Sequence, residues 1–431
     1  MEESIFSFDE FSVEMEDFEV RRTKKHDRMW VVEKGGSICH IPLIHDGVVY
    51  FGSLNYMHYA VDTSNGKMLW RYKTEGILLE SYPCYWDGKV YFGSFDYNMY
   101  CLDAKTGKFL WKFKTFGEIN SPPNVANGRL YFGSRDQNLY CVDADTGRLV
   151  WKFRTMDEVQ SFPEIYDGKV LFGSFDKNFY CLNAETGMLL WKFQTQGEVY
   201  ILSRILVHDG IVYFPSFDNN IRAVRIDDGK LVWKFRTGYY GCVCSPVLYK
   251  NKLYVTSRDG NLFVLSLDGK ELWRFVRKDP ISIPEVVNDK IYFGCEDQNL
   301  YCIDLKGRIL WKFRTEGAVW LKPVSFDGKI LFTCWDCHVY VVDAESGKLI
   351  WKFRTEGEPS PFPPPYDTFE LVMKKTAETG VRGNEEKKKY DLNITDEQKG
   401  TSAYKSRVTY QVSTHYREKG KYQKDSDEEE F

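Results

Sequence analysis

The sequence predicts an all-β protein built from eight copies of one four-stranded unit, and two periodic markers support this prediction. The first marker is a tryptophan that recurs every 38 to 42 residues, at Trp30, Trp70, Trp111, Trp151, Trp191, Trp233, Trp273, Trp311 and Trp351. The second marker is a strand pattern with eight similar copies between residues 48 and 334, for example KVYFGS at 89–94 and RLYFGS at 129–134. A repeat of about forty residues indicates units that complete their core only against their neighbours.

Each unit divides into four short strands separated by turn residues. In residues 119–155 the expected strands are INSPPNV, RLYFGS, LYCVDA and RLVWKFRT, and the turns are NG, RDQN and DTG. No helical period lies between these strands. We therefore predict an eight-bladed β-propeller of four-stranded antiparallel blades over residues 27–365, in place of the two or three domains that 431 residues would otherwise suggest.

The turn between the second and third strands of a unit usually begins with Asp or Asn, as at Asp96, Asp136 and Asp176. A short side chain of this type hydrogen-bonds its own backbone two residues on, so we interpret these residues as structural and not as metal ligands. Asn98 and its counterparts follow two residues later. We expect a left-handed backbone conformation at these asparagines.

Composition and charge narrow the class of partner. The chain has 58 basic and 62 acidic residues, a net charge of −4, and this balance argues against a general nucleic-acid-binding protein. The first twenty residues are acidic and contain neither a basic n-region nor an apolar core, and no run of 18 apolar residues occurs. We expect a cytoplasmic monomer with protein partners, and neither a membrane nor a nucleic acid as partner.

The motif Cys101-x-Asp103-x-x-Thr106-Gly107-x-x-x-Trp111 resembles the tryptophan-docking motif of the pyrroloquinoline-quinone-type (PQQ-like) β-propeller repeat family. The resemblance covers about residues 30–365. In this motif the Gly makes a turn with positive φ, and the Trp covers apolar area against the next blade. The resemblance implies structural docking by Trp70, Trp111, Trp151, Trp191, Trp233, Trp273, Trp311 and Trp351. Blades five to seven depart from the pattern, because Arg225 replaces the Asp and the motifs before Trp273 and Trp311 are one residue short.

The resemblance implies two classes of function. The quinoprotein dehydrogenases of alcohols or sugars hold PQQ through calcium-coordinating carboxylates and amides, and they carry long insertions between blades. This chain has compact blades, no adjacent cysteine pair, and no kinase or phosphate-loop signature like those of enzymes that append such propellers. It resembles more closely the eight-bladed scaffold members, which work without a cofactor. We predict a non-catalytic binding or interaction scaffold with no cofactor; the alternative is a PQQ- and calcium-dependent oxidoreductase.

A ligand site in such a ring is expected at the channel mouth, which is built from the first strands and the loops that lead into them. Aligned on their prolines, these segments place Glu80, Asn120 and Gln160 at one shared position in blades two to four. Trp320 and Lys322 lie on the opposite side. These five residues are the candidate ligand-binding set, and a water-filled polar channel is the alternative interpretation. No catalytic residue and no metal site is assigned.

The eleven cysteines indicate reduced thiols. Four of them share one position in different blades and so cannot pair, and we expect them to be small buried side chains in a reducing compartment: Cys101, Cys141, Cys181 and Cys302. Cys334 and Cys337 have C-x-x-C spacing but flank a predicted turn, which favours a structural role over a metal or redox role.

The ends of the chain raise the question of how the ring closes. Residues 27–36 align with a fourth strand, and residues 358–367 resemble a first strand. We favour residues 27–36 as the closing element, because the proline-rich segment cannot donate a full ladder of hydrogen bonds. Outside the ring we expect an acidic extension over residues 1–26 and a charged extension over residues 366–431, partly strand and with a disordered acidic end.

Overall fold

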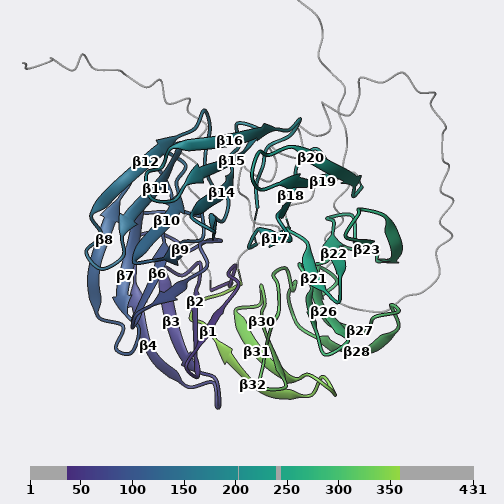
Figure 1. Ribbon diagram of the computed structural model, residues 1–431. Helices are drawn as coiled ribbons and strands as arrows, with labels where there is room; N and C mark the ends of the chain where they lie inside the picture. Colours follow the sequence, from purple (N-terminus) through teal and green to yellow (C-terminus); the bar gives the residue numbers. More distant parts are fainter. Residues whose placement is uncertain (1–35, 202, 239–243, 360–431) are drawn as a thin grey trace, which may run out of the picture. The chain divides into compact units, whose positions relative to one another are not determined.

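A computed structural model describes residues 36–201, 203–238 and 244–359 (Figure 1). These residues form eight four-stranded antiparallel sheets, and they contain no helix, so the described part of the chain has no helix that could cross a lipid bilayer. The sheets follow one another around a ring, with the first strands on the inside and the fourth strands on the outside (Figure 1). The predicted eight-bladed β-propeller is confirmed. The extensions predicted over residues 1–26 and 366–431 lie outside the described residues.

The four strands of each blade are consecutive in the sequence. Blades one to three are β1 Leu43–His45, β2 Val48–Gly52, β3 Met57–Asp62, β4 Met68–Lys73; β5 Cys84–Trp86, β6 Lys89–Gly93, β7 Asn98–Asp103, β8 Phe109–Lys114; and β9 Asn124–Ala126, β10 Arg129–Gly133, β11 Asn138–Asp143, β12 Leu149–Arg154. Blades four to six are β13 Glu164–Tyr166, β14 Lys169–Gly173, β15 Asn178–Asn183, β16 Leu189–Gln194; β17 Leu206–His208, β18 Ile211–Ser216, β19 Asn220–Arg225, β20 Leu231–Arg236; and β21 Val247–Tyr249, β22 Lys252–Thr256, β23 Asn261–Ser266, β24 Glu271–Val276. Blades seven and eight are β25 Glu285–Val287, β26 Lys290–Cys295, β27 Asn299–Asp304, β28 Ile309–Arg314; and β29 Val324–Phe326, β30 Lys329–Thr333, β31 His338–Asp343, β32 Leu349–Arg354.

The first strands are shorter than the sequence predicted. In blade three only Asn124–Ala126 pairs with β10, whereas the extended segment was expected to begin at residue 119. Pro122 and Pro123 have no backbone N–H and cannot donate to the ladder. The residues before them therefore run toward the ring axis as a loop, and this loop carries the polar residues described below.

The turn between the second and third strands is built by its Asp, as predicted. Asp136 accepts a hydrogen bond from the backbone N–H of Asn138 at 3.1 Å. The left-handed residue, however, is Gln137, with φ of 73°, and not Asn138. Asn138 already belongs to β11, and its side-chain amide donates to the carbonyl of Asp136 at 3.0 Å. The predicted left-handed conformation at the asparagines is therefore wrong by one residue, because the amide is used to close the turn.

One contact recurs at all eight junctions between blades: an indole lies on a turn glycine of the next blade. A Cβ placed on Gly147 would fall 2.6 Å from the ring of Trp111, and Gly147 has φ of 70°, so only glycine suits this position. The indole Nε1 of Trp111 donates to the carbonyl oxygen of Ala144 at 3.2 Å. The contact is loosest at Gly307, where a Cβ would fall 3.3 Å from the ring of Trp273.

The ring closes through the same kind of contact. Trp351 of the last blade lies on Gly66 of the first blade, and its Nε1 donates to the carbonyl of Thr63 at 2.9 Å. The purple and yellow-green ends of the described chain accordingly meet in Figure 1. Residues 27–35 lie outside the described residues, so the closing strand that we favoured stays a prediction. Among the described residues, the contact of Trp351 with Gly66 and Thr63 joins the last blade to the first.

We predict that Trp151→Ala lowers the free energy of unfolding by about 3–5 kcal/mol, because it removes the indole between blades three and four and leaves a cavity. Chemical denaturation of the purified protein measures the change. The matched control is Trp86→Ala, since this tryptophan is 37% exposed and lies at no junction contact. A loss below about 1 kcal/mol for Trp151→Ala would contradict a docking role.

Candidate functional site

The loops that enter the first strands bring polar side chains together on the inside of the ring. Glu80, Asn120 and Gln160 each lie four residues before a first strand, β5, β9 and β13 respectively. Asn120 donates through Nδ2 to Oε1 of Gln160 at 2.5 Å, and it also hydrogen-bonds Glu80. The structure therefore unites these three predicted residues in one network, which we call the axial cluster together with the partners named below.

Glu80 is the most constrained member of the axial cluster. Its side chain is 8% exposed, and its backbone has φ of 59°, which is unusual for a residue other than glycine. Burial raises the pKa of the Glu80 carboxyl, and the hydrogen bond from the Tyr200 hydroxyl and the nearby Arg135 oppose that rise. Strained backbone persists where the surrounding structure holds it in place, so this position is a candidate for a functional role.

The charges around Glu80 are mixed. Arg135 lies 3.6 Å from Glu158, which accepts a hydrogen bond from Gln160. Burial lowers the pKa of Arg258, and the carboxylates of Glu296 and Glu80 oppose this shift. Burial also raises the pKa of Glu296 to about 7, against the effect of Arg258. The axial cluster thus joins three carboxyl groups with two guanidinium groups.

Three buried atoms of this region have no hydrogen-bond partner among the described residues, namely Oδ1 of Asn120, the hydroxyl of Tyr82 and Nε of Arg135. They supply an acceptor, a hydroxyl and an N–H donor that a small polar molecule or water could use. No group of three His, Cys, Asp or Glu side chains in the described residues is arranged to hold a metal ion.

The two remaining predicted site residues, Trp320 and Lys322, have different neighbours. Lys322 forms an ion pair with Glu285 at 2.7 Å, and Ser325 donates to the same carboxylate. Trp320 packs edge-on against Trp335, with ring centroids 6.2 Å apart, in an apolar cluster that also contains Leu79, next to Glu80. Trp320 is thus linked to the axial cluster through Leu79, which precedes Glu80. The described ion pair of Lys322 is with Glu285, which is not a member of the axial cluster.

Sequence analysis missed Tyr200, Arg135 and Arg258. Arg135 and Arg258 directly precede the turn Asp of their blades, as does Glu296 in blade seven, where other blades carry apolar residues: Leu54, Phe95, Phe175, Phe217 and Trp335. That break in the repeat was a usable signal. Tyr200 also had a signal, because it lies nine residues after its register tryptophan, as Asn120 and Gln160 do after theirs. The alignment on prolines missed it, since its loop contains none.

The cysteines are thiols with raised pKa values. All ten that the structure describes are free, and burial raises the pKa of Cys101, Cys141, Cys181 and Cys302 to about 12. Cys334 and Cys337 are also buried, and burial raises the pKa of Cys337 to about 11. A thiol that stays protonated at neutral pH is a poor nucleophile and metal ligand, so the C-x-x-C pair suits a structural role.

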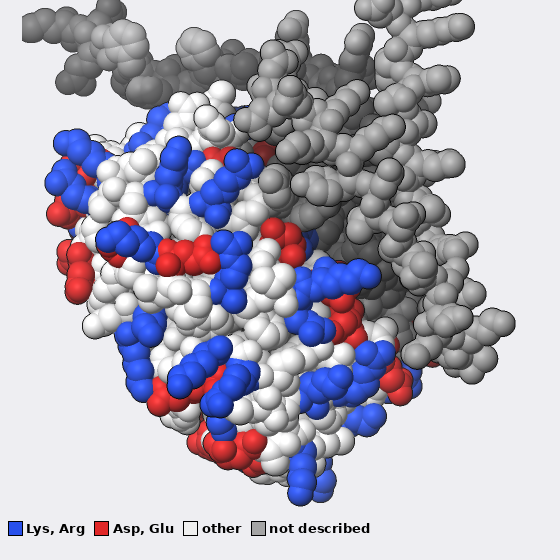
Figure 2. Space-filling view, turned by 90° about the vertical axis from the view of Figure 1, so that its right-hand side faces the viewer, with Lys and Arg blue, Asp and Glu red and all other residues white. Residues whose placement is uncertain are grey.

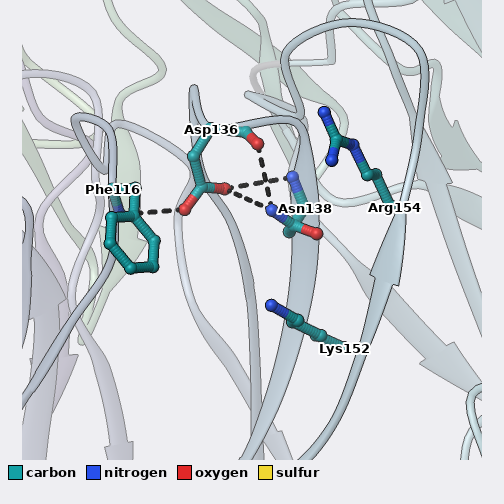
Figure 3. Close-up of a pocket in the computed structure, with 5 residues that line it drawn as sticks. All are labelled: Phe116, Asp136, Asn138, Lys152 and Arg154. Carbon is teal, nitrogen blue, oxygen red and sulfur yellow. Dashed lines mark hydrogen bonds between the residues drawn. The ribbon is translucent and has the colours of Figure 1, made fainter. Parts of the chain in front are cut away.

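A second feature lies on the outside of the ring, where a cleft of about 420 Å³ is lined by Phe116, Asp136, Asn138, Lys152 and Arg154 (Figure 3). We call it the Phe116 cleft. Asp136 is occupied by hydrogen bonds from the backbone N–H groups of Phe116 and Asn138. Figure 3 shows the side chains of Lys152 and Arg154 projecting from β12 toward the side that carries Phe116. The cleft therefore offers an exposed aromatic ring beside two cations.

Two protein-family models match parts of this chain. A family model described as "Beta-alanine-activating enzyme, beta-propeller" matches residues 141–383. A model described as "Outer membrane protein assembly factor BamB" matches residues 19–118 and 78–165. No curated protein sequence matches the chain.

Solved structures show the same fold at low sequence identity. The computationally designed Ika8 protein is 16% identical, with a TM-score of 0.62 over 76% of this chain and 98% of its own. BamB from Moraxella catarrhalis is 17% identical, with a TM-score of 0.59 over 71% and 91%. A europium-containing methanol dehydrogenase is 14% identical, with a TM-score of 0.59 over 72% and 83%. These likenesses concern the fold alone.

We predict that Glu296→Gln flattens the pH dependence of stability. Burial raises the pKa of the Glu296 carboxyl from its usual value of 4.5 to about 7 in the folded protein. Between these pH values the folded state binds more protons than the unfolded state, so wild-type stability falls as pH rises from about 4.5 to 7. The contribution is roughly 3 kcal/mol. Denaturation at pH 5 and pH 8 measures it, with the exposed Glu345→Gln as control. Equal pH dependence in wild type and Glu296→Gln would contradict the assignment.

Proposed function

This chain belongs to the PQQ-like β-propellers and to the family of the beta-alanine-activating enzyme β-propeller, and we propose that it acts as a non-catalytic interaction scaffold for protein partners. One observation carries this proposal. Among the described residues each fourth strand pairs only with the third strand of its sheet, and in seven of the eight blades its first two side chains are exposed and apolar. We call these fifteen residues the apolar belt: Met68, Leu69, Phe109, Leu110, Leu149, Val150, Leu189, Leu190, Leu231, Val232, Leu272, Ile309, Leu310, Leu349 and Ile350.

The apolar belt has the chemistry of a protein-binding surface. Its side chains are between 43% and 52% exposed, although they lie on strands whose outer backbone edge is free. A partner strand or helix placed there would gain apolar contacts, and a strand would also gain main-chain hydrogen bonds. Because seven of the eight blades repeat the apolar pair, a partner could contact several blades at once.

The other half of each fourth strand has a different character. Its outward side chains are basic in fourteen of the sixteen positions, and we call them the cationic belt: Arg71, Lys73, Lys112, Lys114, Lys152, Arg154, Lys192, Lys234, Arg236, Arg274, Lys312, Arg314, Lys352 and Arg354. Figure 2 shows Lys and Arg in separated groups over one side of the ring. Charged side chains protect an edge strand against pairing with other chains. This contrast favours the apolar half as the place where a partner binds.

The alternative, a quinoprotein dehydrogenase, lacks support from the axial cluster. Two of the cluster's side chains already accept hydrogen bonds within the protein: Oε1 of Gln160 accepts from Asn120, and Glu80 accepts from Tyr200. The family name ties the propeller to an enzyme that activates beta-alanine. This supports a propeller that serves a catalytic partner, and we propose a cytoplasmic, monomeric protein without a cofactor.

We predict that weakening the apolar belt removes partner binding while the fold is kept. The test variant combines Leu110→Thr, Val150→Thr and Leu190→Thr, which keep β-propensity on three consecutive blades. The matched control combines Lys112→Gln, Lys152→Gln and Lys192→Gln on the same strands. A partner purified with the wild type should bind the threonine variant at least about tenfold more weakly, since each lost apolar contact costs on the order of 1 kcal/mol.

Affinity measured by titration, with melting temperature as the check on folding, decides this test. The control variant should bind within about threefold of wild type, because exposed charges contribute little. Equal affinity of the threonine variant and the wild type would exclude the apolar belt as the partner surface, and repeated failure to recover any partner would count against the scaffold.

A reconstitution experiment separates the two classes of function. We expect that protein incubated with calcium and PQQ gains no bound quinone absorbance and reduces no dye with alcohols or sugars, because Gln160 and Glu80 already accept hydrogen bonds from Asn120 and Tyr200. Bound quinone together with substrate-dependent dye reduction would replace the scaffold by an oxidoreductase. Recombinant quinoprotein treated in parallel shows that the assay works.

A further inference from the structure

The residue type at the loop position of Phe116, between a fourth strand and the next blade, differs from blade to blade. This residue follows the fourth strand, and its backbone N–H donates to the turn Asp of the next blade, as Phe116 does to Asp136 at 3.0 Å and Glu316 does to Asp336 at 3.1 Å. The position is Glu75, Glu316 and Glu356 at three junctions. Phe116 and Met156 are the apolar exceptions, and they are 89% and 84% exposed.

At one of these three junctions the carboxylate pairs with a cation of the next blade. Glu356 forms an ion pair with Arg71, a member of the cationic belt on the adjacent fourth strand, whereas Glu75 and Glu316 form no ion pair within the described residues. At the Phe116 cleft the corresponding cations are Lys152 and Arg154, and the loop supplies a phenyl ring in place of the carboxylate. Arg154 donates to the neutral amide oxygen of Gln137, and no described carboxylate forms an ion pair with either cation. The cleft therefore holds two cations and an exposed ring without the carboxylate found at blade one.

The missing chemistry is present elsewhere in the same chain. Residues 2–20 contain eight Asp or Glu and no Lys or Arg, and they also contain four Phe. A segment of this composition could place a carboxylate on the cations and an apolar side chain on Phe116 together. The fifteen residues from 21 to 35 can span up to about 50 Å when extended, which is on the scale of a domain.

We propose that the Phe116 cleft binds the acidic, aromatic segment of residues 2–20 of the same chain. A carboxylate of the segment takes the place that Glu356 has at Arg71, and a phenylalanine covers the exposed face of Phe116. The corresponding position before blade four is a weaker site, because Met156 there faces Lys192 and the neutral Gln194. This proposal concerns a surface other than the apolar belt, so either can fail without the other.

Zero-length cross-linking of the full chain with a water-soluble carbodiimide tests the proposal, because it joins only a lysine and a carboxylate in direct contact. We expect Lys152 to cross-link to residues 2–20 at least about fivefold more often than Lys192, Lys312 or Lys352 does. The yield should fall as salt is raised, since exposed ion pairs are screened. Cross-links distributed evenly over these lysines, or none from Lys152, would overturn the proposal.

Two variants and one mixing experiment complete the test. Phe116→Glu restores the carboxylate found at Glu356 and should reduce the Lys152 cross-link at least about fivefold, whereas Glu316→Gln, the matched change in another blade, should leave it unchanged. An unchanged cross-link in Phe116→Glu would overturn the role of the cleft. In a mixture of isotopically heavy and light chains, cross-links within one chain support the proposal, and cross-links between heavy and light chains show a second copy as occupant and contradict it.

Discussion

The ring depends on a contact between the largest side chain and a residue that has none. An indole at the centre of each fourth strand lies on a turn glycine of the next blade, where a Cβ would come within about 3 Å of the ring at most junctions. Seven of these indoles also donate a hydrogen bond to a carbonyl of the next blade. Because Trp351 repeats the contact on Gly66, the last blade is joined to the first, and the loops inside the ring are fixed relative to one another.

This constraint divides the surfaces that function can use. Strands two and three are buried on both faces and serve the ring itself. The loops before the first strands can vary, and there Glu80, Asn120 and Gln160 form a hydrogen-bonded network. The fourth strands lie on the outside of the ring, and each of their exposed surfaces has an apolar half and a mostly basic half. A rigid ring with an apolar outer row has the properties of a platform for other proteins, which supports the proposed scaffold role.

The repeat made most of the fold predictable from sequence. The spacing of the tryptophans and the Thr-Gly turns specify strand order and blade number, because each unit places the same residue types at the same positions. The part that residues 27–36 and 358–367 play in closure was not predictable, since both match strands; among the described residues the Trp351 contact with Gly66 joins the last blade to the first. The axial cluster was predictable in part: Glu80 and Asn120 share a register position, and Tyr200 occupies the same position in a loop that lacks the proline used for the alignment.

Hydrogen–deuterium exchange of the protein, alone and with a purified partner, tests the scaffold most directly. The account predicts that partner binding slows exchange in the outer strands, at β8, β12 and β16 or their counterparts, because the free edge and the apolar belt become covered. Exchange in the loops before the first strands should stay unchanged. Protection confined to the loops that carry Glu80, Asn120 and Gln160, with no change in the outer strands, would contradict it.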